Sequence, residues 1–187
     1  MVLMAAALEA CGGDGGATKT ATPAAVQTQA PQATATVAAC PTAPAGPQFA
    51  EVFTGAATGQ GQGVLTEVAA ATSRCTDTVT FAFAGAGLPA YEVKYVQAAV
   101  SCGSGLPVTT AGSAQITLRF EPAVAHDEQG NPTVSAREQT PNFATVKQLK
   151  PWCDFEGVVG WVIGTEARYY TVTAAQSPSR IVVEVYH

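Results

Sequence analysis

The sequence has little charge and few aromatic residues, and both shortages exclude classes of protein. Charged residues make up 12% and aromatic residues 7% of the 187 residues. This composition excludes a coiled coil, because long paired helices are rich in charged side chains. The net charge of -5, from 9 basic and 14 acidic residues, argues against a nucleic-acid-binding surface. The length allows one domain with a hydrophobic core rather than two large ones.

Motifs of the common enzyme classes are also missing. The sequence contains no G-x-S-x-G, no G-K-[ST], no H-E-x-x-H and no G-x-G-x-x-G between a strand and a helix. His126, followed by Asp127, lies in a polar run typical of an exposed turn. A catalytic or metal-binding role for this pair is the alternative to that turn. We therefore expect a non-catalytic protein with no cofactor and no metal site.

Residues 12–47 contain only two charged residues, Asp14 and Lys19, among alanine, threonine, proline, glutamine and glycine. Such a stretch buries too little apolar surface to offset the roughly 1–2 kcal/mol per residue that ordering the backbone costs. We expect a disordered linker over residues 12–47. It separates a signal-like segment, residues 1–11, from a folded domain, residues 48–187.

Residues 1–11 resemble the end of a bacterial lipobox. Leu8 lies three residues before Cys11, and two glycines follow the cysteine. The apolar run of about eight residues is too short to cross a bilayer of about 30 Å. Glu9 and the missing basic residues are unlike such a signal, and the alternative is an apolar N-terminus with a cysteine nearby. On the lipobox interpretation, Cys11 is the lipid attachment site. The protein is then exported, and it is either anchored to the outer face of the cytoplasmic membrane or secreted.

The rest of the sequence alternates between apolar and polar side chains with the two-residue period of half-buried strands. Val79, Phe81 and Phe83, for example, alternate with smaller or polar neighbours. No window carries a helical stripe, and glycine-rich turns separate the segments. The pattern predicts an all-β fold, an antiparallel β-sandwich of about eight short strands. The expected strands cover residues 64–70, 78–83, 91–96, 116–120, 143–149, 158–163, 169–173 and 181–185.

Setting Cys11 aside leaves four cysteines, with no C-x-x-C pair and few histidines to complete a zinc site. Two disulfides in an oxidising compartment fit this number. If the strands run simply up and down, Cys75, Cys102 and Cys153 lie in loops at one end of the sandwich, and Cys40 lies on the linker. Of the three possible connectivities we favour Cys102 with Cys153 and Cys40 with Cys75, although the spacing does not choose among them.

Two aromatic residues are candidates for ligand contact. Trp152 follows Pro151 in an expected loop beside Cys153, where a partly exposed indole can stack on a sugar or a partner. Tyr169 and Tyr170 point to opposite faces of a strand, so one of them is expected to be exposed. The alternative for these aromatic residues is simple packing at an edge.

Two carboxylates form the remaining candidate. Asp154 and Glu156 lie two residues apart, so in an extended segment they point the same way and can bind a cation or transfer a proton. The composition favours a tight turn instead, with Gly157 closing it and Phe155 turned inward. Trp161 alternates with apolar neighbours and is expected in the core.

Five segments carry a family resemblance, and they are residues 77–83, 87–96, 103–108, 154–164 and 178–185. In this order they resemble the AMIN-like domain of actinobacterial and related secreted proteins and lipoproteins. The resemblance covers about residues 63–186. It implies a β-sandwich related to the amidase N-terminal (AMIN) domain, a non-catalytic module that directs cell-wall amidases and secretin-type proteins to the envelope through peptidoglycan. Thr78 stands where an arginine is common, so arginine-mediated binding is not implied here.

These observations lead to a functional hypothesis and an alternative. The hypothesis is an envelope-anchored binding module that recognises a cell-wall polymer such as peptidoglycan, and an exposed aromatic and polar groove across one sheet favours it. The alternative is a structural or protein-interaction lipoprotein that docks an envelope partner through a sheet edge or a loop end. An apolar patch or an unguarded strand edge favours this alternative. Neither function involves nucleic acid, and the membrane is contacted only through the lipid anchor.

Overall fold

The computed structural model describes residue 40, residues 52–166 and residues 169–187. The expectations for the signal-like segment and its Cys11, and for the linker apart from Cys40, lie outside the described residues. Within them no helix is present, so none has the length and apolarity that crossing a membrane requires.

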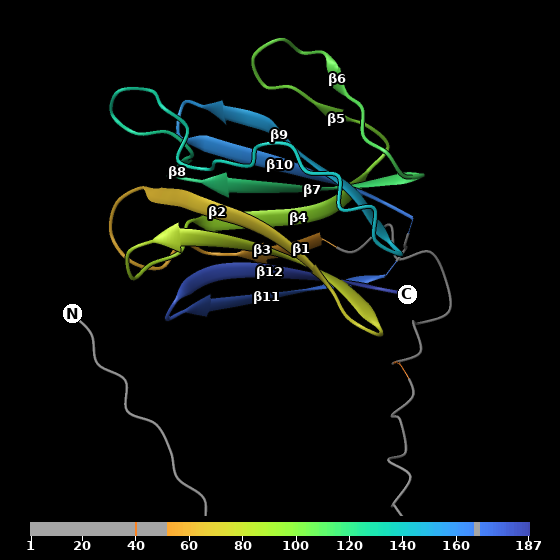
Figure 1. Cartoon of the computed structure of the whole chain (residues 1–187). Coiled ribbons are helices and arrows are strands. Elements are labelled where there is room, and N and C mark those ends of the chain that lie inside the picture. The colour runs from red at the N-terminus through yellow and green to blue at the C-terminus, as the bar shows by residue number, and fades with distance from the viewer. Residues whose placement is uncertain (1–39, 41–51, 167–168) are drawn as a thin grey trace, which may run out of the picture. The chain divides into compact units, whose positions relative to one another are not determined.

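The described strands form two five-stranded sheets that pack face to face (Figure 1). This arrangement confirms the predicted antiparallel β-sandwich. The first sheet has the order β1 (Val52–Gly55), β4 (Ala90–Val96), β7 (Ala114–Glu121), β10 (Val158–Thr165) and β9 (Val146–Phe155). The second has the order β11 (Tyr170–Gln176), β12 (Ser179–Tyr186), β3 (Thr76–Ala84), β2 (Gly63–Thr72) and β8 (Ala123–Val124).

Each strand expected from the sequence is present, and four short strands were not expected. These are β1, β8 and the hairpin of β5 (Ala99–Val100) and β6 (Pro107–Val108), which forms a separate two-stranded sheet. Strands of two to four residues carry too few side chains to show an alternating pattern. Of these four strands, β5 and β6 shape the candidate site.

Alternating apolar side chains of the two sheets meet in a core rich in aromatic rings. Phe81 on β3 lies 5.3 Å from Phe120 on β7 and 6.2 Å from Trp161 on β10, measured between ring centroids. Phe83 lies 5.1 Å from Phe120 in an edge-to-face arrangement. Each such pair adds about 0.5–1.5 kcal/mol beyond the burial of its area. Trp161 is only 1% exposed, as expected for a core residue.

A buried carboxylate joins the two sheets at one end of the sandwich. Asp77, on β3, has no exposed surface. Its Oδ2 accepts hydrogen bonds from the backbone N–H and the hydroxyl of Thr145, at 2.7 and 2.6 Å, and from the N–H of Val146, at 2.9 Å. The hydroxyl of Thr72 donates to Oδ1 at 2.7 Å. Burial alone raises the pKa of Asp77, but these donors outweigh it and hold the pKa below the usual range.

Two disulfides are present, Cys40–Cys75 and Cys102–Cys153, and they are the two pairs favoured from the sequence. The expectation that three cysteines share one end of the sandwich is wrong. Cys75 lies next to the Asp77 end, where β9 begins, whereas Cys153 lies near the far end of β9 and pairs with Gly160 of β10.

The error arose because Pro151 suggested a loop, but β9 continues through it. A proline lacks the N–H that a central strand needs, yet it fits an edge strand such as β9. Cys102 lies between β4 and β7, in the connection where it was expected, but this connection forms the unexpected β5–β6 hairpin.

Candidate ligand-binding groove

A short arm, residues 98–108, comprises β5, β6 and the turn between them and projects from the first sheet (Figure 1). The first residues of the arm and outward-facing residues of β4 and β7 line one depression. Gln115 of β7 holds the base of the arm. The side-chain oxygen of Gln115 accepts the Ala99 N–H at 2.6 Å, and its amide nitrogen donates to the Val108 carbonyl at 2.8 Å. The disulfide from Cys102 to Cys153 fastens its tip to β9. The arm is therefore fixed to the sheet at both ends.

Trp152 lies in strand β9, not in the loop that the sequence suggested. Its indole N–H donates to the carbonyls of Leu118, at 3.2 Å, and Trp161, at 3.0 Å. The ring covers Gly160 on the outer face of β10. A register shift between β9 and β10, between Gly160 and Trp161, accompanies this placement. Trp152 is half-buried, so it combines a fixed orientation with an accessible part of the indole.

Between the arm and the sheet is a groove of about 240 Å³ that ends at Trp152. Outward-facing residues of β4 and β7 form its floor, and the arm forms its wall. The lining residues are Glu92, Lys94, Val96, Ala98, Ala99, Val100, Thr117, Arg119 and Trp152.

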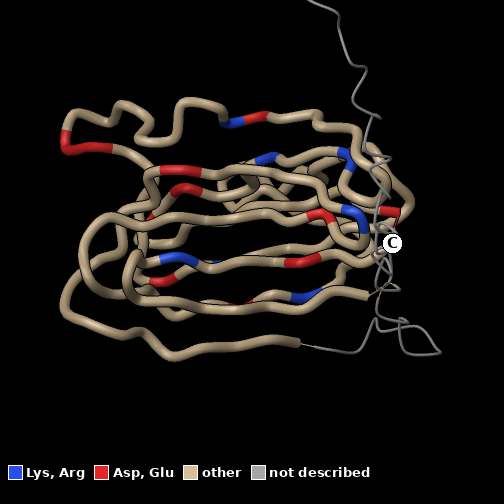
Figure 2. Tube along the Cα trace, turned by 60° about the horizontal axis from the view of Figure 1, so that its bottom comes forward, with Lys and Arg blue, Asp and Glu red and all other residues tan. Residues whose placement is uncertain are grey.

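The charges in the groove are paired. Lys94 lies 2.6 Å from Glu92, and Arg119 forms an ion pair with Glu121. The four side chains are 39–47% exposed, so each pair contributes at most about 1 kcal/mol and its members can turn to a ligand at little cost. Figure 2 shows acidic and basic residues interspersed along the strands rather than gathered by sign. The groove therefore suits a ligand with polar groups of both kinds rather than a polyanion.

A second depression, of about 380 Å³, also has Trp152 in its lining, and both depressions are open. The arm meets β9 at this residue, where the N–H of Cys102 donates to the carbonyl of Trp152 at 3.2 Å. The residues of this second depression are Ser101, Cys102, Gly103, Arg137, Pro151, Trp152, Cys153, Asp154 and Phe155.

Asp154 and Glu156 do not form a site together. The Oδ1 atom of Asp154 accepts the N–H of Ala125 at 3.0 Å and lies 3.0 Å from Nδ1 of His126. Glu156 is exposed in the hairpin turn, with a φ of 50°. Phe155 is 58% exposed, so the expectation that it turns inward is wrong. The neighbouring Asp154 takes the inward position of the strand, which directs Phe155 outward.

His126 was expected to be solvated, and its contact with Asp154 was missed because 28 residues separate them in the sequence. Its side chain is 38% exposed. The part of the chain that the structure describes contains no group of three or more His, Cys, Asp or Glu residues able to hold a metal ion.

Tyr169 lies away from the groove. Tyr170 is fully buried in the core, whereas Tyr169 is half-buried and packs on Tyr186 with ring centroids 4.9 Å apart. The structure thus places Trp152 in the lining of both depressions and Asp154 in that of the second, whereas Glu156 and Tyr169 line neither.

Sequence reasoning missed the floor of the groove. Glu92 and Lys94 on β4, with Thr117 and Arg119 on β7, occupy the outward positions of half-buried strands, where polar residues are ordinary. The register pairs Glu92 with Arg119 and Lys94 with Thr117. This pairing of polar residues across two strands could have indicated the groove floor, but it becomes visible only when the register of β4 and β7 is known.

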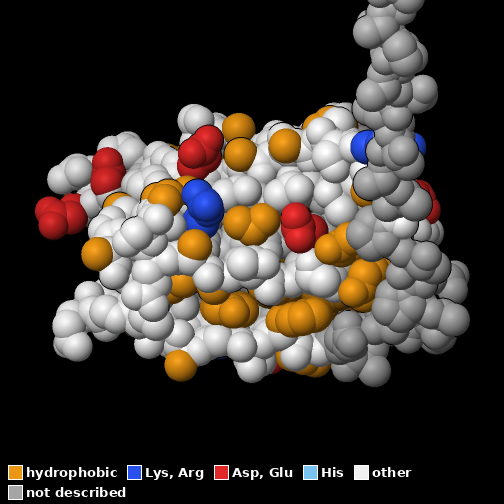
Figure 3. Space-filling model, turned by 90° about the horizontal axis from the view of Figure 1, so that it is seen from below, with side chains coloured by type: hydrophobic (Ala, Val, Ile, Leu, Met, Phe, Trp, Pro, Cys, Tyr) orange, Lys and Arg blue, Asp and Glu red, His pale blue; other side chains and the backbone are white. Residues whose placement is uncertain are grey.

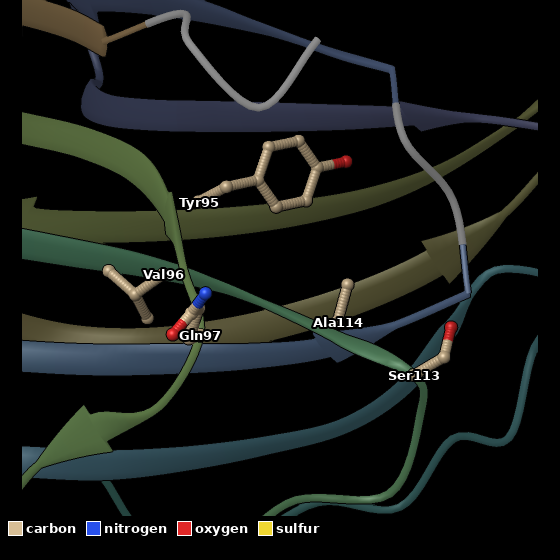
Figure 4. Close-up of a pocket in the computed structure, with 5 residues that line it drawn as sticks. All are labelled: Tyr95, Val96, Gln97, Ser113 and Ala114. Atoms are coloured by element: carbon tan, nitrogen blue, oxygen red, sulfur yellow. The ribbon is translucent and has the colours of Figure 1, made fainter. Parts of the chain in front are cut away.

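Another depression, of about 540 Å³, lies between the end of β4 and the start of β7. In Figure 4 the labelled side chains of Tyr95, Val96, Gln97, Ser113 and Ala114 are spread along the two strands and do not converge. The hydroxyl of Ser113 donates to Glu166 at 2.6 Å.

The chain was compared with models of protein families, with curated proteins and with solved structures. The sequence model of one family, described as the AMIN-like domain, matches residues 63–187. No curated protein and no solved structure matches the chain.

Proposed function

Because the chain belongs to the AMIN-like domain family, we propose that it is an envelope-anchored module that binds a cell-wall polymer such as peptidoglycan in the groove beneath the arm. AMIN-like domains are in general non-catalytic modules associated with peptidoglycan. The family and the two disulfides indicate an exported envelope protein. Anchoring by a lipid on Cys11 is part of the proposal.

The observation that carries this proposal is that Trp152 lines both depressions. Two carbonyls hold its indole N–H, so the ring keeps one orientation without a ligand. A fixed aromatic surface loses little entropy when a sugar ring stacks on it. The paired charges beside it supply donors and acceptors for hydroxyl and amide groups. An open groove that a chain can follow fits a polymer better than a small substrate.

Co-sedimentation with insoluble peptidoglycan tests the proposal. The full chain is purified under oxidising conditions and compared with Trp152→Ala, Arg119→Gln and Lys94→Gln. Arg74→Gln, at the β2–β3 turn, is the matched control because it removes an exposed charge outside the groove. Circular dichroism and thermal unfolding establish that each variant is folded, which matters most for Trp152→Ala.

We expect saturable binding that Arg74→Gln leaves unchanged. Losing one hydrogen-bonding side chain should weaken binding about fivefold to thirtyfold, as for a contact of about 1–2 kcal/mol. Saturable binding that none of the groove variants weakens would place the site elsewhere on the molecule. An absence of binding by the wild-type chain would refute the proposed function.

A second candidate function, docking of an envelope protein, is favoured by a cluster of exposed hydrophobic side chains around Cys102–Cys153. Val100 is 49%, Leu106 65% and Phe155 58% exposed. Val100 and Leu106 lie on the arm, and Phe155 lines the depression that contains Cys102. Leu106→Asp should reduce cross-linking of the chain to an envelope protein in intact cells while leaving peptidoglycan binding unchanged. Unchanged cross-linking would remove the support for this candidate.

A further inference from the structure

The four edges of the two five-stranded sheets differ in how they are protected against pairing with another strand. Native sheets protect an edge by keeping it short or bulged, by placing prolines and charges on it, or by covering it. β1 has only four residues and β8 only two, so β2 forms the edge beyond β8. That part of β2 has a bulge between Leu65 and Glu67, carries the charge of Glu67, and is covered in part by two side chains that donate to its carbonyls. The long edge strand β9 contains Lys147, Lys150 and Pro151, has two register shifts, and is covered in part by the bridge between Gln139 and Leu149.

β11 has none of these protections. It runs for seven residues, Tyr170–Gln176, without a charged residue or a proline. Its register with β12 is uninterrupted from Tyr170 to Gln176, so it carries no bulge. No described strand pairs with its other edge. It is therefore the one long and regular edge that the described residues leave open to strand pairing.

The backbone of β11 presents a defined set of groups at this edge. The N–H of Tyr186 on β12 donates to the carbonyl of Tyr169. This bond determines which residues of β11 direct their backbone N–H and C=O groups toward β12. In an antiparallel pair, backbone groups of alternate residues point to opposite sides. Thr171, Thr173 and Ala175 therefore direct their backbone groups toward β12. Val172 and Ala174 direct theirs outward.

From this geometry we infer that β11 pairs with β11 of a second copy of the chain, antiparallel, about a two-fold axis at Thr173. Val172 of one copy then lies opposite Ala174 of the other, and the outward N–H and C=O groups of both residues bond across the edge. Thr173 lies opposite its own equivalent, in a pair without hydrogen bonds. The two sheets become one continuous ten-stranded sheet, since each contributes five strands.

Charge complementarity favours a second copy over an unrelated strand. Ala175 lies beside Arg180 of β12, and Thr171 lies beside Glu184. The two-fold axis puts Ala175 of one copy opposite Thr171 of the other. Arg180 of one copy and Glu184 of the other then share one row, three strand spacings apart, or about 14 Å.

Only small side chains separate these two charges, so the long side chains can extend toward each other. The symmetry repeats the row, and each row joins one positive and one negative charge. Figure 3 views the molecule from the side on which β11 lies, where hydrophobic and uncharged polar side chains cover most of the visible described surface. Pairing of β11 with its equivalent therefore brings no two like charges opposite each other along this edge, since β11 has no charged residue.

Sedimentation velocity of the full chain across the micromolar range tests the inference. All samples carry Cys11→Ser, which leaves no cysteine outside the two disulfides. Thr173→Lys places two like charges directly opposite each other at the axis, which is unfavourable between paired strands. Ala71→Lys is the matched control, since it adds the same charge at an exposed position of β2, in the same sheet but on the side opposite to β11.

We expect a concentration-dependent dimer whose dissociation constant rises at least about tenfold in Thr173→Lys and is unchanged in Ala71→Lys. Thermal unfolding checks that Thr173→Lys is folded. A wild-type chain that stays monomeric at every concentration overturns the inference. Equal effects of the two lysine substitutions also overturn it.

Oxidative cross-linking tests the register independently of the lysine variants. Residues opposite each other in a pair without hydrogen bonds have Cα atoms about 4.5 Å apart, which a disulfide can span. Thr173→Cys should therefore form a covalent dimer. Thr171→Cys should not, because its equivalent lies four residues along the partner strand, about 13 Å away. Equal yields from the two variants contradict a two-fold axis at Thr173.

Discussion

The indole of Trp152 occupies the space that a β-carbon on Gly160 would need. Its six-membered ring would lie within contact distance of such a carbon, so the outer face of β10 is open to the tryptophan only because residue 160 has no side chain. The end of the proposed binding groove thus depends on a glycine of the neighbouring strand. This dependence can be measured as a coupling between the two residues.

Gly160→Ala should displace Trp152 and destabilise the fold by about 1–3 kcal/mol, the usual cost of overpacking. In a Trp152→Ala background the same substitution should cost much less, because the ring that the methyl group meets is gone. Chemical denaturation of the four proteins of this double-mutant cycle gives the coupling free energy. Additive effects would show that the two residues do not compete for this space.

Asp77→Asn should destabilise the protein by about 2–4 kcal/mol. An amide oxygen at the Oδ2 position can still accept from Thr145 and Val146, but these bonds lose the charge of the carboxylate. The amide nitrogen then faces the Thr72 hydroxyl, which loses the acceptor that Oδ1 provided. Urea unfolding at neutral pH measures the loss. Asp127→Asn is a suitable comparison, because Asp127 is exposed and its side chain bonds only within its own turn. The urea midpoint of this variant should stay close to that of the wild type.

The stability of the wild type should also fall in acid because of Asp77. The lowered pKa in the folded state means that the unfolded chain binds this proton more tightly, so stability rises with pH in that range. The contribution is complete above the unfolded pKa of about 3.9 and is lost as the pH falls through the lower folded value. Urea midpoints measured from neutral pH to pH 2 should decline less steeply in Asp77→Asn than in the wild type. Parallel curves would be inconsistent with this assignment.

The two disulfides should be separable by function. Replacing Cys40 and Cys75 together, or Cys102 and Cys153 together, by serine should each cost about 2–4 kcal/mol. Only the second pair fastens the arm, so only its removal should also weaken binding to peptidoglycan. Denaturation and co-sedimentation of the two double variants check both effects. Equal binding by the two would show that the groove does not need the fastened arm.

The long strands could be predicted because their alternation is a local property. Val79, Phe81 and Phe83 point to the core of β3 regardless of what packs against them, and the same holds for Ile181, Val183 and Val185 of β12. The sandwich follows from such segments, since each must bury one face. Even the favoured disulfide pairs coincide with the structure, although the reasoning that placed three cysteines at one end was wrong.

The groove could not be predicted in the same way because its parts are distant in sequence. Gln115 binds Ala99 of the arm, 16 residues earlier, and Trp152 reaches a carbonyl 34 residues away. Neither contact leaves a periodic signal. Trp152 was selected for its neighbourhood to Cys153 and Pro151, and that choice gave the right residue with the wrong local structure.

The disulfide between Cys40 and Cys75 also determines how the domain bears mechanical load. A pull on the chain before residue 40 enters the sandwich through Cys75, at the turn before β3, and bypasses residues 41–74. The four-residue β1, which the covalent path would otherwise strain first, carries no tension. The force reaches β3 instead, a strand paired on both sides and held by Asp77. Reducing this one bond would move the point of attachment from a central strand to a four-residue edge strand.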